Sequence, residues 1–106
     1  MFLVVNTHPR FLRVNSIVLI QAAGDYSEVV TPEGKRGLVQ KSMAEWEERL
    51  PEKYFCRIHR SVIVNLEFVD SLEETSASSY RVHMRGLEAP VIMSRRYAAR
   101  IRDRLG

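Results

Sequence analysis

The chain has 106 residues, which is the length of one typical domain and leaves no room for a second core. Sixteen lysines and arginines stand against 13 aspartates and glutamates, so the net charge is +3. Most of these cations are arginine, whose planar guanidinium binds phosphate and guanine edges through paired hydrogen bonds, so the composition favours a nucleic-acid partner. A single cysteine excludes an internal disulfide framework and favours a reducing, cytoplasmic compartment, and the apolar runs are too short to cross a membrane.

Most of the chain reads as short strands bounded by turn residues. They fall at residues 2–5, 11–14, 17–21, 26–31, 37–39, 55–58, 61–65, 68–72, 80–84 and 89–93. Pro9 predicts a turn between the first two strands, and Gly24 supplies the positive φ that a tight hairpin needs between the next two. Strands at such regular spacing predict a mainly β domain built from antiparallel hairpins.

A short internal helix is predicted over about residues 42–50. Ser42 and Glu45 have the spacing of a capping box, in which each side chain satisfies the other residue's backbone N–H. The apolar stripe of this helix consists of Met43, Trp46 and Leu50, with Pro51 ending it. Glu47 and Glu48 lie outside the stripe, so we expect them on a solvated face.

A second helix is predicted over about residues 95–105, with Ser94 as its N-cap. Its apolar face consists of Tyr97, Ala98, Ile101 and Leu105, and its basic ridge of Arg96, Arg100 and Arg104. The purely structural interpretation is an amphipathic helix with a basic outer face. Arg95 and Arg96 favour a functional interpretation, because they follow the cap directly, where backbone amides and the helix dipole attract anions.

The densest polar cluster lies between the apolar residues of the run 55–65. If those apolar residues are core, the polar ones are displayed at a strand end: Arg57, His59, Arg60 and Ser61. No carboxylate lies close enough in sequence to orient His59 as a base, so the cluster suits phosphate and base-edge contacts better than hydrolysis. Cys56 is expected to be a small buried residue, and Cys56 with His59 lacks a second ligand pair for zinc. We therefore predict no enzyme activity, no metal and no cofactor.

The run from Phe55 to Asn65 resembles the central signature of the LytTR DNA-binding domain, the output domain of many bacterial response regulators in two-component systems. Further blocks with the same likeness are residues 23–27, 41–46, 49–51 and 90–97. They follow the order and spacing of the family over nearly the whole chain. The resemblance therefore predicts a single LytTR-type DNA-binding domain over residues 1–106.

The resemblance implies an elongated fold of small antiparallel sheets whose loops enter successive major grooves of double-stranded DNA. By the same likeness, the base-reading positions fall on Ser27, Arg60 and Arg96, and the phosphate-contacting or supporting positions on Arg57, Ser61, Ser94 and Arg95. His59 either contacts DNA or buttresses its loop, and Asn65 is expected to hydrogen-bond backbone.

The predicted function is sequence-specific DNA binding for transcriptional regulation, by a domain that is monomeric in solution and pairs on direct-repeat half-sites. A receiver domain or a regulatory partner protein outside this chain would control it. The alternative hypothesis is a protein-interaction module that docks an acidic partner through the arginine-rich face. Neither hypothesis involves a membrane.

Overall fold

The computed structural model describes residues 2–5, 8–11, 13–75 and 79–99, with side chains from residue 13 onward. The strands are β1 (Phe2–Val5), β2 (His8–Phe11), β3 (Leu19–Ala23), β4 (Tyr26–Val30), β5 (Arg36–Val39), β6 (Phe55–His59), β7 (Val62–Asn65), β8 (Val69–Glu74), β9 (Tyr80–Met84) and β10 (Val91–Met93). Helix α1 spans Met43–Arg49, and single 3₁₀ turns lie at Val14–Ser16 and Leu66–Phe68. A second helix begins at residue 95, and its described part extends to residue 99.

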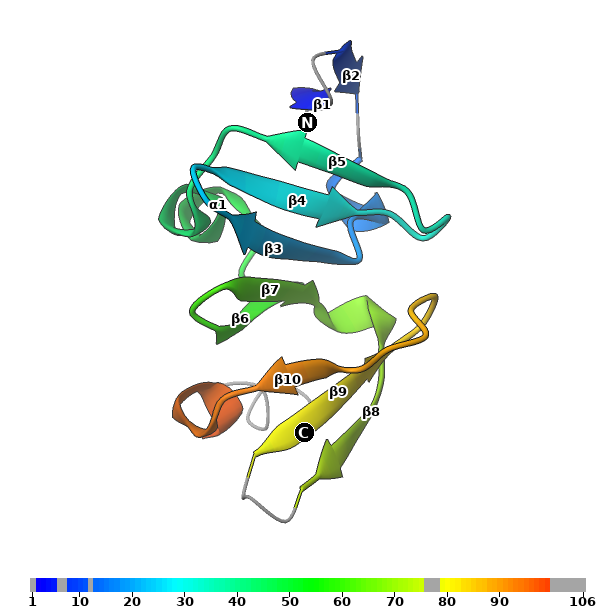
Figure 1. Cartoon of the computed structure of the whole chain (residues 1–106), viewed down its shortest axis with the longest axis vertical. Helices are drawn as coiled ribbons and strands as arrows, with labels where there is room; N and C mark the ends of the chain where they lie inside the picture. The colour runs from blue at the N-terminus through cyan, green and yellow to red at the C-terminus, as the bar shows by residue number, and fades with distance from the viewer. Residues whose placement is uncertain (1, 6–7, 12, 76–78, 100–106) are drawn as a thin grey trace.

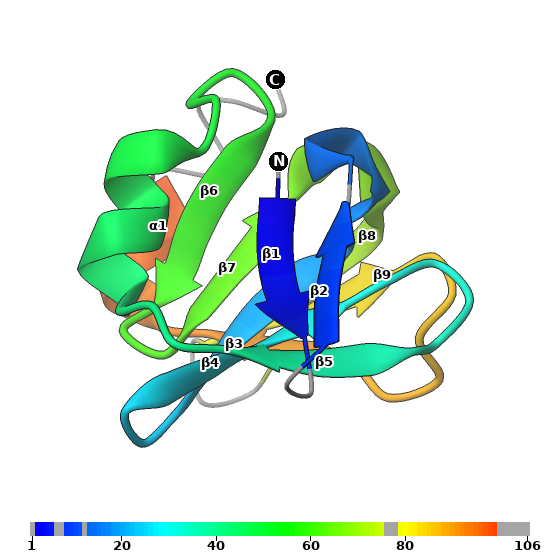
Figure 2. The ribbon, with the colours of Figure 1, turned by 90° about the horizontal axis from the view of Figure 1, so that it is seen from above.

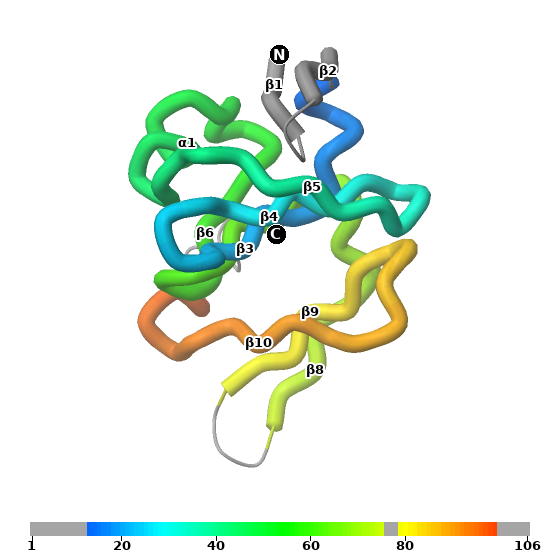
Figure 3. The backbone as a smooth tube through the Cα atoms, turned by 45° about the horizontal axis from the view of Figure 1, so that its top comes forward, coloured from blue at the N-terminus to red at the C-terminus, as the bar shows by residue number. Residues whose placement is uncertain are grey.

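A five-stranded antiparallel sheet in the order β5-β4-β3-β7-β6 lies in the middle of the molecule (Figure 1). A three-stranded sheet in the order β10-β9-β8 is stacked below it (Figures 1 and 3). The β1–β2 hairpin lies beyond β5 at the opposite end (Figure 1). The molecule measures 42 × 25 × 25 Å, so it is elongated along the direction in which these sheets follow one another. The predicted architecture of small antiparallel sheets is therefore confirmed.

Alternate residues of the central sheet pack to opposite sides. Leu19 belongs to a cluster shared with the three-stranded sheet, whereas the next residue, Ile20, belongs to a cluster shared with α1. The first cluster contains Val18, Leu19, Val30, Cys56, Ile58, Val62, Val64, Val82, Met84 and Met93. The second contains Ile17, Ile20, Val29, Val39, Met43, Trp46, Leu50, Phe55 and Ile63. Because both faces of the sheet are covered at its middle, β7 is buried along its whole length, whereas the edge strand β5 alternates exposed and buried residues.

Helix α1 forms as its sequence predicts. The Glu45 backbone N–H donates to Ser42 Oγ at 3.1 Å, and the Ser42 backbone N–H donates to Glu45 Oε1 at 3.2 Å. Glu47 and Glu48 are exposed, whereas Trp46 is completely buried. The hydrogen bond from the Ser42 backbone lowers the pKa of Glu45. This stabilisation of α1 is therefore complete above the ordinary pKa of glutamate and is lost as the pH falls through the lowered value.

The N-terminal hairpin differs from the prediction. Pro9 lies inside β2, opposite Val4, and the chain after β2 continues into the 3₁₀ turn at Val14–Ser16 instead of a strand over 11–14. The reason is that β2 pairs only with β1 among the described strands, and an edge strand tolerates a proline, which cannot donate a backbone hydrogen bond. Each of the other predicted strands is confirmed, and both of its ends lie within two residues of the predicted positions.

The start of the C-terminal helix is confirmed at residue 95, directly after Ser94. Tyr97 and Ala98 pack against the cluster shared by the five-stranded and three-stranded sheets, as the apolar face of this helix predicts. The rest of the predicted helix, with Arg100, Ile101, Arg104 and Leu105, lies outside the described residues.

Candidate nucleic-acid interface

Three of the predicted recognition segments lie on the same side of the molecule. They are the β3–β4 turn at residues 24–25, the β6–β7 turn at residues 60–61 and the helix start at residues 94–99, all on the left in Figure 1. Viewed from above, the two turns again lie together (Figure 2). Strand pairing explains this arrangement, because Gln21 near the end of β3 lies opposite Val62 at the start of β7. We call this part of the molecule the turn side.

Two backbone hydrogen bonds join the three segments of the turn side. The Ala22 N–H at the end of β3 donates to the Ser61 carbonyl oxygen at 2.8 Å. The Ser94 N–H donates to the Ile58 carbonyl oxygen at 3.1 Å. The ladder between β6 and β7 shifts register around Ile58, between Arg57 and His59. Because such a bulge takes one residue out of the regular ladder, the Ile58 carbonyl is available to the segment that carries Arg95 and Arg96.

The backbone of the β6–β7 turn is held from within the domain. A guanidinium nitrogen of Arg57 donates to the Arg60 carbonyl oxygen. The Ser61 backbone N–H donates to His59 Nδ1 at 3.2 Å, and the Ser61 hydroxyl lies 2.9 Å from the same nitrogen. A backbone N–H can only donate, so Nδ1 accepts in this contact. His59 therefore buttresses the turn, which was one of its two predicted roles.

The arginine side chains of the turn side differ in exposure. Arg60, Arg95 and Arg96 are exposed, and the Arg96 guanidinium lies 6.0 Å from the centre of the Tyr97 ring. Within the described ranges, no hydrogen bond or ion pair engages the Arg60 side chain. Arg57, by contrast, is only 20% exposed and lies 3.5 Å from Glu47 Oε1 of α1. The structure thus brings together all the predicted arginines but displays only three of them.

Ser27 does not occupy the position that its predicted base-reading role requires. Its side chain is completely buried, accepts a hydrogen bond from Trp46 Nε1 at 2.6 Å and donates one to the Val39 carbonyl oxygen at 3.3 Å. A hydroxyl used in this way inside the core cannot reach a base edge without opening the α1 packing. We therefore leave Ser27 out of the interface and assign it to the attachment of the first hairpin to α1.

Two other expectations from the central run are confirmed. Asn65 is completely buried, and its side chain donates to the Ile17 carbonyl oxygen at 2.9 Å and accepts from the Glu67 N–H at 3.0 Å. It therefore fixes backbone, as expected. Cys56 is buried in the cluster shared with the three-stranded sheet, which agrees with a packing role.

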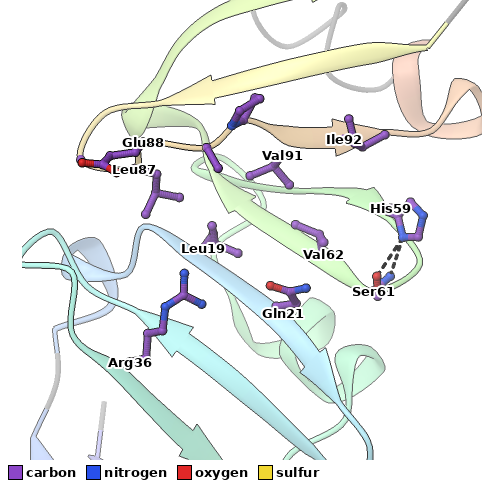
Figure 4. Close-up of a pocket in the computed structure, with 13 residues that line it drawn as sticks. Leu19, Gln21, Arg36, His59, Ser61, Val62, Leu87, Glu88, Val91 and Ile92 are labelled. Carbon is purple, nitrogen blue, oxygen red and sulfur yellow. Dashed lines mark hydrogen bonds between the residues drawn. The ribbon is translucent and has the colours of Figure 1, made fainter. Parts of the chain in front are cut away.

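A cleft of about 610 Å³ lies behind the β6–β7 turn, between the central sheet and the loop leading into β10 (Figure 4). Its lining is mixed: it includes the apolar Val62 and Ile92 and the polar Gln21, with His59 and Ser61 at one end.

In the described part of the chain, no three His, Cys, Asp or Glu residues group to hold a metal ion. None of the helices described there is long and apolar enough to span a membrane.

Sequence reasoning did not identify the contact between Glu47 and Arg57. Glu47 was assigned to a solvated helix face, and it is indeed exposed, but Arg57 reaches it from β6. Spacing along α1 carries no signal of this pair, because Arg57 belongs to a different element. Only the docking of α1 beside β6, visible in Figure 2, brings the two residues together.

A family model described as the LytTr DNA-binding domain matches residues 9–106. The chain belongs to the LytTR family of DNA-binding domains. The function class of the family, DNA binding in transcription regulators, therefore holds for this LytTR domain, and the resemblance read from its motifs is confirmed.

Similar proteins agree with this assignment. The chain is 33% identical over 95 residues to the heme-containing CO-sensing transcriptional regulator RcoM 1 of Paraburkholderia xenovorans, covering 90% of this chain and 35% of that protein. It is 34% identical over 68 residues to the sensory transduction protein LytT of Bacillus subtilis, covering 63% and 27%. A solved LytTr DNA-binding domain from Bacillus cereus superposes with a TM-score of 0.87 at 26% identity, covering 100% of this chain and 95% of the other. The chain spans about a third of the length of the curated relatives.

Proposed function

We propose that this LytTR domain binds double-stranded DNA with sequence specificity through its turn side. The β6–β7 turn would present Arg60 to one major groove, and the start of the C-terminal helix would present Arg96 to the next. The observation that carries this proposal is the Ser94–Ile58 hydrogen bond, which fixes the two arginine-bearing segments relative to each other. Each arginine can bind the O6 and N7 atoms of a guanine, a contact worth about 1–3 kcal/mol of discrimination.

The remaining groups of the turn side would position the protein on the duplex. The backbone amides after Ser94, together with Arg95, suit a phosphate oxygen, and such contacts supply most of the salt-dependent affinity. We propose further that the domain is monomeric in solution, pairs on direct-repeat half-sites, and is controlled by a receiver domain or regulatory partner outside this chain.

The test begins with selection of a preferred duplex from random sequence, followed by titrations over a range of salt concentrations. We expect affinity to fall steeply with log salt while the preference over a scrambled duplex persists. Arg60→Ala and Arg96→Ala should each relax the preference at separate base pairs by roughly five- to 150-fold. Arg13→Ala is the matched control, because this exposed arginine precedes β3, at the end of that strand away from the turn side.

Two outcomes would contradict the proposal. A wild-type domain without any preference among duplexes would favour the protein-interaction hypothesis. Retained selectivity in both Arg60→Ala and Arg96→Ala, equal to that of Arg13→Ala, would place the reading of sequence elsewhere on the domain.

A further inference from the structure

The turn that carries Arg60 is fixed by hydrogen bonds that leave the Arg60 side chain unused. Its backbone is held at three successive points: the Arg60 carbonyl by Arg57, the Ser61 N–H by His59, and the Ser61 carbonyl by Ala22. Groups that read a ligand act best when surrounding hydrogen bonds hold them in the productive geometry before binding. The turn fits this description, because its supporting hydrogen bonds come from within the domain while the Arg60 side chain is exposed.

Of the three supports, Arg57 connects the turn to helix α1. One terminal nitrogen of its guanidinium donates to the Arg60 carbonyl, and the other lies 3.5 Å from Glu47 Oε1 on α1. The Arg57 side chain is 20% exposed, whereas Glu47 is 45% exposed. The planar fork of an arginine suits this double contact, since its donors have a fixed mutual orientation that lysine lacks.

We propose that Glu47 and Arg57 are a positioning pair for Arg60, setting the direction in which the turn presents that side chain to DNA. This inference rests on the proposed function and replaces the expectation that Arg57 contacts phosphate. One terminal nitrogen of Arg57 donates to a carbonyl oxygen and the other pairs with a carboxylate, and its Nε is buried without a hydrogen-bond partner among the described residues. A guanidinium held in this way acts on DNA through the turn.

Simple electrostatics and the positioning role predict changes in different quantities for Glu47→Gln: overall affinity in the first case and discrimination between duplexes in the second. Removing a negative charge near DNA should strengthen binding to every duplex slightly. Loss of the support should instead weaken discrimination at the base pair that depends on Arg60. Glu48→Gln is the matched control, because it removes the same charge from the next residue of α1, which is also exposed.

The test measures the ratio of affinities for the preferred duplex and for a duplex changed at the base pair that Arg60→Ala identifies. We expect Glu47→Gln to lower this ratio roughly three- to tenfold and Glu48→Gln to leave it unchanged. Arg57→Lys keeps the charge but not the fork, so the ratio should fall similarly while the slope of log affinity against log salt stays the same. Thermal unfolding verifies that each variant is folded, and Glu47→Gln carries the test if Arg57→Lys is not.

A double-mutant cycle distinguishes positioning from general stabilisation. If Glu47 acts through Arg60, Glu47→Gln should cause no further loss of discrimination in the Arg60→Ala background. Additive losses, or equal behaviour of Glu47→Gln and Glu48→Gln, would overturn the positioning pair while leaving DNA recognition by Arg60 intact. Absence of any sequence preference in the wild-type domain would overturn the proposed function itself, and the pair with it.

Discussion

The turns that end the β3–β4 and β6–β7 hairpins lie side by side on one sheet, yet they are fixed in different ways. The first contains Gly24, whose φ of 63° suits a tight turn, and displays Asp25. The second contains no glycine, displays Arg60, and is held by side chains from Arg57 and His59. The first turn therefore owes its shape to a residue that adopts it readily, and the second owes its shape to surrounding hydrogen bonds. A turn of the second kind can combine a fixed backbone with a long reading side chain.

The largest expected effect comes from removing the support that both hairpins share. Trp46 packs against the central sheet and donates to Ser27 of the first hairpin, and its neighbour Glu47 contacts Arg57 of the second. Trp46→Ala should lower the free energy of unfolding by about 3–5 kcal/mol, measured by urea denaturation, and abolish DNA binding at moderate temperature. Trp46→Phe keeps most of the apolar volume and should lose less. Near wild-type stability of the alanine variant would mean that the hairpins do not depend on α1.

A smaller effect on stability, with none on recognition, is expected for the buried hydroxyl of the first hairpin. Ser27→Ala leaves the Trp46 indole N–H without its partner, which should cost about 1–3 kcal/mol of unfolding free energy. The pattern of preferred base pairs should stay the same, because the hydroxyl faces the core. An altered base preference at unchanged stability would restore Ser27 to the interface.

Replacing the glycine tests whether the first turn owes its shape to residue choice. Gly24→Ala should cost about 1–2 kcal/mol, because alanine is strained at positive φ, while an added Cβ meets no atom within 4 Å. Gly24→Asn is the control, since asparagine tolerates this conformation better. If both variants were as stable as the wild type in urea, the contrast between the two turns would disappear.

The smallest effect is expected at the exposed carboxylate of the first turn. Asp25→Asn removes a negative charge from the turn side, so affinity should rise about twofold for every duplex at low salt and return to the wild-type value at high salt. Fluorescence anisotropy with the preferred and scrambled duplexes measures this directly. A gain confined to the preferred duplex would mean that the first turn also reads base pairs.

Local signals explain which parts of this molecule its sequence predicts. The capping box at Ser42, the apolar stripe ending at Leu50 and the positive φ of Gly24 all depend on near neighbours in the chain, and all are confirmed. In the run from Phe55 to Asn65, Phe55, Ile58 and the segment 62–64 are buried as predicted and Arg60 is exposed at the tip, whereas Arg57 is mostly covered.

The errors arise where distant residues decide the outcome. Pro9 is a strong turn signal, but its place on an edge strand depends on pairing with β1. Ser27 lies two residues before the buried Val29 on the same face of β4, so strand alternation alone was a sign that it points into the core. The contact between Glu47 and Arg57 has no such sign, because it exists only once α1 has docked beside β6.

The pairing of β3 with β7 has a consequence for the order in which the molecule assembles. The β3–β4 and β6–β7 hairpins each pair neighbours in the chain, whereas Ile20 meets Ile63 only after the long intervening segment has closed into a loop. Closing a loop of this length is slow compared with forming a hairpin. We therefore expect the hairpins to form early and the turn side to be completed in the rate-limiting step. A partly folded chain would then hold both turns, each on its own hairpin, without the alignment that recognition needs.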